Sequence, residues 1–201
     1  MNDKATDEDS GVLEKLREIW RNELKFFSND GKKEREVWVV SEFLRVFGVQ
    51  YQESELISFE QNSDVDIGFR EARFQVKELS DPNLRRYKDI KETFRSIQTA
   101  NRLDEISWAG TAQDCPAPTR MYELICEQAK ELSAKYSSRE RIDLLFYVTR
   151  TFASIVQKDE IDSNDLKSLG WRSVSCVNAR QAIVLFVSRD CPKFLHAPFL
   201  K

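Results

Sequence analysis

The chain opens with two stretches in which apolar residues recur at helical spacing. Between residues 11 and 27 they form one stripe, which predicts an amphipathic helix that ends at the polar turn 28–31. Between residues 34 and 47 apolar stripes occupy two faces, so we expect this second helix to be mostly buried and to end at Gly48. Residues 1–10 are polar and acidic, and they predict a disordered tail.

The period then changes from helical to alternating. Polar and apolar residues alternate within 64–69 and within 73–77, and the three residues between these segments predict a β-hairpin. Residues 55–60 predict a strand before the hairpin. After it, residues 84–101 carry a helical apolar stripe, and residues 103–118 are typical of a loop.

The chain from residue 119 onward predicts one more helix and three strands. Thr119 is suited to cap the start of the helix, which extends to Tyr136. The element order predicts an α/β or α+β fold with a mixed central sheet flanked by helices. The length of 201 residues suits one domain, so we expect residues 11–201 to form it, with 84–118 as an inserted basic helix and loop. The remaining predicted strands are short and apolar: 142–148, 171–177 and 182–187, the last two forming a hairpin.

Composition excludes several classes of protein. With 41% hydrophobic and 32% charged residues, the chain is typical of soluble globular proteins, and no apolar run reaches the length of a membrane span. The N-terminus lacks the features of a secretory signal, and the four cysteines show no CxxC pair, so we expect a cytoplasmic protein with reduced thiols. The single histidine, His196, argues against a His-based zinc site or a Ser-His-Asp triad.

Charge is unevenly distributed along the chain. The net charge is −3, but residues 70–102 contain nine basic and five acidic residues, a local excess of +4. Such a patch can attract phosphate groups, although a solvated helix face would look the same, and both interpretations stay open. Lys88, Lys91 and Arg95, spaced i, i+3 and i+7, share one face of the predicted helix 84–101. The candidate nucleic-acid-binding residues are Arg85, Arg86, Lys88, Lys91 and Arg95.

The predicted hairpin gathers polar groups on one face of the sheet. Strand alternation places Asp64 and Asp66 on one face, and it gives Gln75 and Lys77 a common face on the next strand. Folding the hairpin sets Asp66 opposite Lys77 in one register and opposite Gln75 in another. Both registers bring together a carboxylate, an amide oxygen and an ammonium group. Alternatively, residues 62–64 form only a turn, and Lys77 makes a salt bridge to an acid.

Phosphodiester hydrolysis uses groups of this kind. A divalent metal ion stabilises charge on the phosphate and acidifies bound water, and Mg²⁺ accepts oxygen ligands while keeping several waters. A nearby lysine can orient the attacking water. Glu42, in the predicted second helix, adds a carboxylate among apolar residues. It either joins such a site or is satisfied by solvent or by an arginine such as Arg45.

Asp66, followed nine residues later by Gln75-Val76-Lys77, resembles the D…(E/Q)xK signature of the PD-(D/E)xK nuclease superfamily. It is most similar to the Mrr-like branch, where glutamine often replaces the acid and a glutamate-bearing helix precedes the strands. Residues 39–79 also resemble an uncharacterised bacterial family of suggested endonucleases. The resemblance implies a restriction-endonuclease-like core. No proline precedes Asp66 or Asp64, so the first letter of the signature is missing.

The resemblance implies a role for each residue of the motif. Asp66 would be the main ligand of Mg²⁺ or Mn²⁺, with Asp64 as the fallback. Gln75 would replace the second acidic ligand, with the carbonyl of Val76 beside it. Lys77 would orient the nucleophilic water. Glu42 would be an outer carboxylate or a ligand of a second metal ion.

We therefore expect a metal-dependent endonuclease that hydrolyses phosphodiester bonds of DNA. The alternative is a catalytically inactive module that keeps the nuclease fold to bind nucleic acid or a protein partner, and metal binding separates the two. A homodimer also stays open, because many members of the superfamily act as dimers, but the sequence shows no interface.

Overall fold

The computed structural model divides the chain into two compact units. One, here called the helical unit, comprises Met1–Arg35 and Pro82–Gln113, and the other, here called the sheet unit, comprises Glu36–Asp81 and Asp114–Lys201. The single domain remains a prediction. The structure describes residues 7–60, 62–80, 86–109, 116–149, 155–156 and 161–200.

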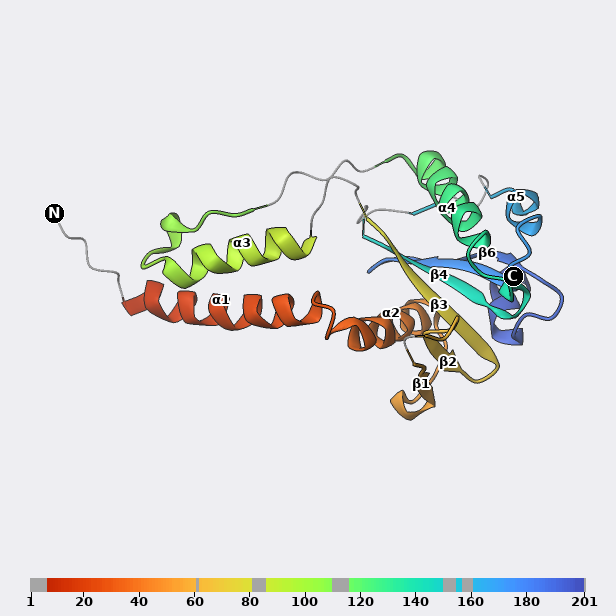
Figure 1. Ribbon diagram of the computed structural model, residues 1–201, viewed down its shortest axis with the longest axis horizontal. Helices are drawn as coiled ribbons and strands as arrows, with labels where there is room; N and C mark the ends of the chain where they lie inside the picture. The colour runs from red at the N-terminus through yellow and green to blue at the C-terminus, as the bar shows by residue number, and fades with distance from the viewer. Residues whose placement is uncertain are drawn as a thin grey trace. The chain divides into compact units, whose positions relative to one another are not determined.

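The sheet unit contains a six-stranded mixed sheet in which the strands lie in chain order (Figure 1). Three central strands, β3, β4 and β5, are parallel, and the other neighbours are antiparallel. This confirms the predicted mixed sheet flanked by helices. The strands are β1 (Leu56–Ser58), β2 (Ile67–Phe69), β3 (Ala72–Leu79), β4 (Asp143–Val148), β5 (Ser173–Val177) and β6 (Ala182–Val187).

Two helices cover opposite faces of this sheet. On one face α2 (Lys32–Phe47) packs Phe43 against Phe74 of β3, with the ring centroids 5.8 Å apart. On the other face α4 (Pro118–Ser133) buries Ile125 in a core with Phe146 of β4. Since strand side chains alternate between faces, each β3 side chain points to one of these two faces of the sheet.

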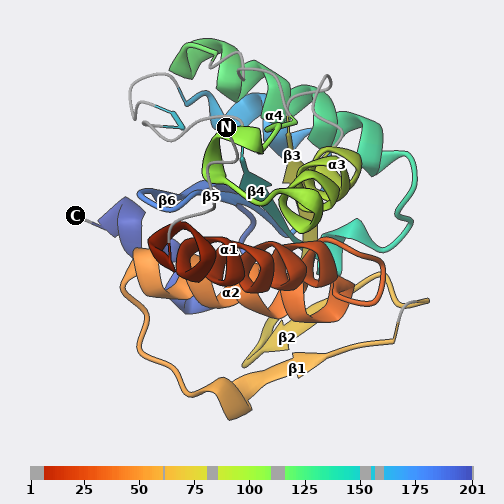
Figure 2. The same ribbon diagram turned by 90° about the vertical axis from the view of Figure 1, so that its left-hand side faces the viewer.

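The helical unit pairs α1 (Asp7–Phe26) with α3 (Arg86–Thr99), which lie side by side in Figures 1 and 2. The helices are antiparallel: Arg17 donates to the carbonyl of Ala100 at 3.0 Å, and Arg86 lies over the Phe27 ring. The buried apolar residues of this unit include the cluster Leu13, Ile97, Ala100 and Ile106, together with Ile90 and Phe94 of α3.

Several predicted boundaries are wrong for physical reasons. Helix α1 begins at Asp7, so residues 7–10 are helical and not part of a disordered tail, as suits acids at a helix N-terminus. Helix α4 is capped by Ala117 with Pro118 in its first turn, so Thr119 is not the cap. Residues 64–66 precede β2, because Ser63 accepts a hydrogen bond from the Val65 amide and forms a turn.

Short helices account for most of what the sequence did not predict. Most of them are too short to show a period. They are α5 (Ser163–Lys167), the three-residue 3-10 turns Glu53–Glu55, Leu103–Glu105 and Arg139–Arg141, and the eight-residue 3-10 helix Lys193–Leu200. None of the described helices combines the length and apolar character needed to cross a membrane.

Candidate active site on the β2–β3 hairpin

The hairpin that carries the D…QxK motif turns over two residues, not three. Phe69 pairs with Ala72, and Arg70 takes the left-handed conformation at φ 51° that a tight turn requires. Ile67 pairs with Phe74, which places Asp66 opposite Gln75. The structure thus selects the second of the two predicted registers.

Asp66 and Gln75 are in direct contact. The Oδ2 atom of Asp66 accepts hydrogen bonds from the Gln75 side-chain amide and, at 2.8 Å, from the Val76 backbone amide. Both side chains are buried, Asp66 at 8% and Gln75 at 2% exposure. The carboxylate therefore serves as a partner for β3 just before β2 begins. Because the N–H and C=O of a strand residue point to the same edge, the Val76 carbonyl lies on this edge too.

Lys77 belongs to the same face of the sheet. Phe74 and Val76 pack in the layer beneath α2, so the alternating residues Gln75 and Lys77 point to the opposite face, which α4 covers. Lys77 is half-buried, and its Nζ atom lies 5.8 Å from the centroid of the Tyr136 ring, just beyond α4. An ammonium group over a tyrosine ring is a weakly favourable contact that leaves the nitrogen available to other partners.

Asp64 and Glu42 are not brought into this contact. Asp64 is exposed and accepts a hydrogen bond from Ser138 at 3.1 Å. Glu42 accepts two hydrogen bonds from Arg45, at 2.9 and 2.6 Å, and it sits on α2, which covers the other face of the sheet. The hydrogen bonds and the charge of Glu42 raise the pKa of Arg45. Of the two predicted environments for Glu42, the structure shows the arginine pair.

The candidate nucleic-acid-binding residues belong to the helical unit, and Arg85 lies outside the described residues. Lys88, Lys91 and Arg95 are exposed along α3, as their spacing predicts. Lys88 forms an ion pair with Glu92 at 3.6 Å, and the Arg86 guanidinium lies 4.8 Å from the centroid of the Phe27 ring. Their role in binding remains a prediction.

Carboxylate, carbonyl and amide oxygens are the ligand types that a hard divalent cation prefers, and the Asp66 region contains all three. Among the described residues no cluster of three or more Asp, Glu, His or Cys side chains could hold a metal ion. A cation here would use the Asp66 carboxylate, the Val76 carbonyl, the Gln75 amide oxygen and water, a donor set that Mg²⁺ accepts. Gln75 turns its amide nitrogen to Asp66. The amide would have to turn over for its oxygen to join the carboxylate, a change that leaves its shape nearly unaltered.

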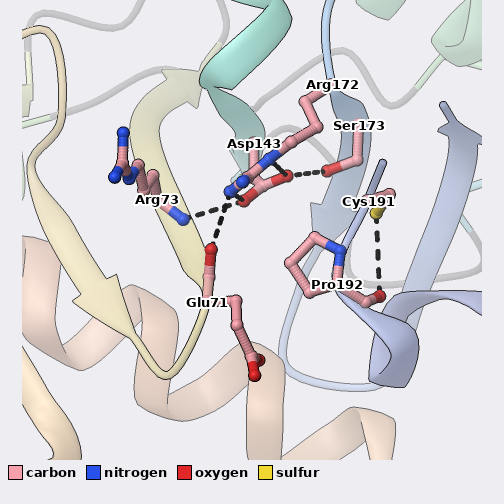
Figure 3. A network of polar contacts seen from close by, with 7 residues as sticks. All are labelled: Glu71, Arg73, Asp143, Arg172, Ser173, Cys191 and Pro192. Atoms are coloured by element: carbon pink, nitrogen blue, oxygen red, sulfur yellow. Dashed lines mark hydrogen bonds and ion pairs between the residues drawn. The ribbon is translucent and has the colours of Figure 1, made fainter. Parts of the chain in front are cut away.

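A buried acid that the sequence analysis missed fixes the turn end of this hairpin (Figure 3). Asp143, at the start of β4, is fully buried. Its carboxylate accepts hydrogen bonds from Ser173 Oγ at 2.8 Å, from two nitrogens of Arg172, and at 2.8 Å from the backbone amide of Arg73. Arg172 also donates to the Glu71 carbonyl at 3.0 Å.

This network ties the β2–β3 turn to β4 and β5. Asp143 holds the start of β3 through the Arg73 amide. Arg172 holds the β2–β3 turn through the Glu71 carbonyl. The signal in the sequence was a lone acid in the apolar run 142–148, since a buried carboxylate requires partners. Asp143 and Arg172 therefore act as positioning residues for the hairpin.

The chain is a mixed α/β protein with a six-stranded sheet. Its hairpin carries a buried acid, a buried amide and a neighbouring lysine on one face of that sheet. Residues 8–201 match a family described as "Putative endonuclease, protein of unknown function (DUF1780)", and the chain belongs to this family. No curated protein matches the chain.

A solved structure from Pseudomonas aeruginosa strain PAO1 is similar in fold. That protein is described as of unknown function and of a monooxygenase superfamily. The TM-score is 0.58 at 22% sequence identity, and the match covers 98% of this chain and 92% of the other. At this identity the likeness concerns the fold alone.

Proposed function

We propose that the protein is a Mg²⁺- or Mn²⁺-dependent endonuclease that hydrolyses phosphodiester bonds of DNA at the β2–β3 hairpin. The observation that carries the proposal is the contact of Asp66 with Gln75 and the Val76 amide, with Lys77 two residues further on the same face. Membership of a family described as "Putative endonuclease, protein of unknown function" supports it. The resemblance of Asp66 and Gln75-Val76-Lys77 to the PD-(D/E)xK signature supports it too.

Each residue would contribute through its own chemistry. Asp66 would hold the cation together with the Val76 carbonyl and the turned amide of Gln75. The cation would supply charge stabilisation at the phosphate and a more acidic bound water. Lys77, positively charged and half-buried, would orient the attacking water and stabilise the charge that develops on the phosphate. The exposed bases of α3 would bind the phosphate backbone.

The test is cleavage of supercoiled plasmid and single-stranded DNA with Mg²⁺ or Mn²⁺. Native protein is expected to cut, and Lys77→Ala to lose about 100-fold or more of the rate, as for other groups that stabilise charge in a transition state. Lys193→Ala removes an exposed lysine remote from the hairpin in sequence and is expected to cut at the native rate. Cutting that survives both Lys77→Ala and a chelator would contradict the proposal.

One observation favours the alternative, a catalytically inactive module with this fold. Gln75 presents a nitrogen to Asp66, which satisfies the acid without any cation. The variant Gln75→Glu separates the two. In an inactive fold, two adjacent buried carboxylates lower the melting temperature whether or not metal is present. In a metal site, Mn²⁺ restores the melting temperature of Gln75→Glu and raises its metal affinity above that of the native protein.

A further inference from the structure

The sheet exposes apolar side chains at its β1 edge. The core beneath α4 contains described residues of β3, β4, β5 and β6, and none of β1 or β2. These two strands lie at the edge of the sheet away from α4 (Figures 1 and 2). Ile57 is 60% exposed there and Phe59 is 40% exposed. This edge therefore offers apolar surface to a ligand.

Gly68 seats the Phe59 ring on one face of the sheet. The residues on either side of Gly68 point into the core beneath α2, so Gly68 faces the opposite side, as Gln75 and Lys77 do. A Cβ atom on Gly68 would lie 3.0 Å from one atom of the Phe59 ring and 3.5 Å from the next. The ring therefore lies over the glycine, where a side chain on residue 68 would otherwise stand.

The Phe59 ring is a neighbour of the proposed cation site. The Phe59 backbone amide donates to the Asp66 carbonyl at 2.9 Å, and Gly68, beneath the ring, follows Asp66 by two residues. Asp66 in turn contacts Gln75 of β3. An exposed aromatic ring and the proposed cation ligand are therefore joined by a hydrogen bond between adjacent chain segments.

Two bases share this face with the ring. Arg73 and Lys77 alternate with the β3 residues that pack beneath α2, so both point to the Phe59 side. The Arg73 side chain is exposed and forms no ion pair with a described residue. An aromatic ring flanked by bases is suited to a nucleobase and its phosphates, because every base has a π face and every nucleotide a negative charge.

The acids close to this surface are engaged. Asp66 accepts from Gln75 and the Val76 amide, and Asp64 accepts from Ser138 at 3.1 Å. Glu60, next to Phe59, is engaged as well. The proposed cation would offset the charges of the two aspartates and leave the two bases to bind phosphates.

We propose that the Phe59 ring stacks on an unpaired base of the DNA, so that the protein acts on single-stranded or locally unpaired DNA. This proposal rests on the proposed function, which supplies DNA as the ligand. Bases within a duplex are already stacked on their neighbours, and exposing one costs free energy. A single strand offers its bases to an aromatic ring without that cost. Arg73 and Lys77 bind neighbouring phosphates.

The test is the affinity of the full chain for a labelled single-stranded oligonucleotide and for its duplex. Fluorescence anisotropy at low salt measures it, with a chelator present so that no metal-dependent cutting occurs. The native protein is expected to bind the single strand more tightly. Phe59→Leu keeps an apolar side chain but removes the ring, and it should weaken single-strand binding by about 10-fold while leaving duplex binding unchanged.

Two further variants separate stacking from a general effect on the surface. Phe59→Tyr keeps the ring and should bind the single strand within about threefold of the native affinity. Trp38→Ala removes an equally exposed ring, 40%, from α2, which covers the other face of the sheet, and it should leave the affinity unchanged.

Cleavage distinguishes this proposal from the proposed function. Single-strand binding through Phe59 without cutting would end the nuclease proposal and support this one. Equal native affinity for the two forms of DNA, or an unchanged affinity in Phe59→Leu, would overturn it even if the protein cuts. A native dimer that Phe59→Leu dissociates would assign the ring to a second copy of the chain and overturn it too.

Discussion

The contacts of Asp143 allow the effect of removing its carboxylate on stability to be worked out. The fully buried side chain accepts hydrogen bonds from Arg172, Ser173 and the Arg73 amide. In Asp143→Ala the guanidinium of Arg172, 12% exposed, would lose its counter-charge while still partly buried. The amide of Arg73 would lose its acceptor as well.

The expected loss follows from the nature of these partners. Breaking a buried ion pair by removing one member costs about 3–5 kcal/mol, because the remaining charge is uncompensated. Partial hydration of Arg172 favours the lower end, and the unsatisfied Arg73 amide adds about 1–3 kcal/mol. We therefore expect Asp143→Ala to lower the free energy of unfolding by about 4 kcal/mol. Adding Arg172→Met should recover part of this loss, since no uncompensated charge would remain.

Urea unfolding followed by circular dichroism measures the change. Asp190→Ala, which removes an exposed acid of the same unit, should stay within about 0.5 kcal/mol of the native value. A loss below about 1 kcal/mol in Asp143→Ala would refute the reasoning. An Asp143→Ala, Arg172→Met double variant whose loss equals the sum of the two single losses would show that the pair is not coupled.

Three further predictions concern packing, the site and the thiols. Gly31→Ala should lower stability by about 1–3 kcal/mol, because its Cβ would lie 2.5 Å from two backbone carbonyl oxygens. Gly11→Ala, whose Cβ would have nothing within 4 Å, should raise stability by about 0.5–1 kcal/mol. Melting temperatures that shift in the same direction for both variants would contradict this. Glu42→Gln should leave Mn²⁺ affinity unchanged in a titration, and a clear loss would return this residue to the site. Burial raises the pKa of Cys191 to about 12, and it also raises the pKa of Cys176, so iodoacetamide at pH 8 should label either thiol only after unfolding, as mass spectrometry can show.

Periodicity predicted the long elements, because a helix or strand with one buried face must repeat its apolar residues. It could not choose the hairpin register. The alternation of 64–69 and 73–77 fits both pairings, and the choice rests on Arg70 adopting a left-handed conformation in a two-residue turn. That one torsion places Asp66 opposite Gln75 and not opposite Lys77.

Contacts between segments that are distant in the sequence could not be predicted either. Asp143 and Arg172 are 29 residues apart, and neither strand shows the pairing by itself. The partner of Glu42 was only three residues away at Arg45, and local spacing offered it as one alternative. The antiparallel packing of α1 on α3 joins two segments that the sequence shows as separate amphipathic helices.

Metal binding at Asp66 is the central claim, and a calorimetric titration with Mn²⁺ tests it most directly. The native protein and Asp64→Asn are predicted to bind one ion with similar affinity, since Asp64 is exposed and contacts Ser138. Asp66→Asn is predicted to lose binding while keeping a native circular dichroism spectrum. Absence of binding by the native protein, or a loss in Asp64→Asn with binding intact in Asp66→Asn, would contradict the account.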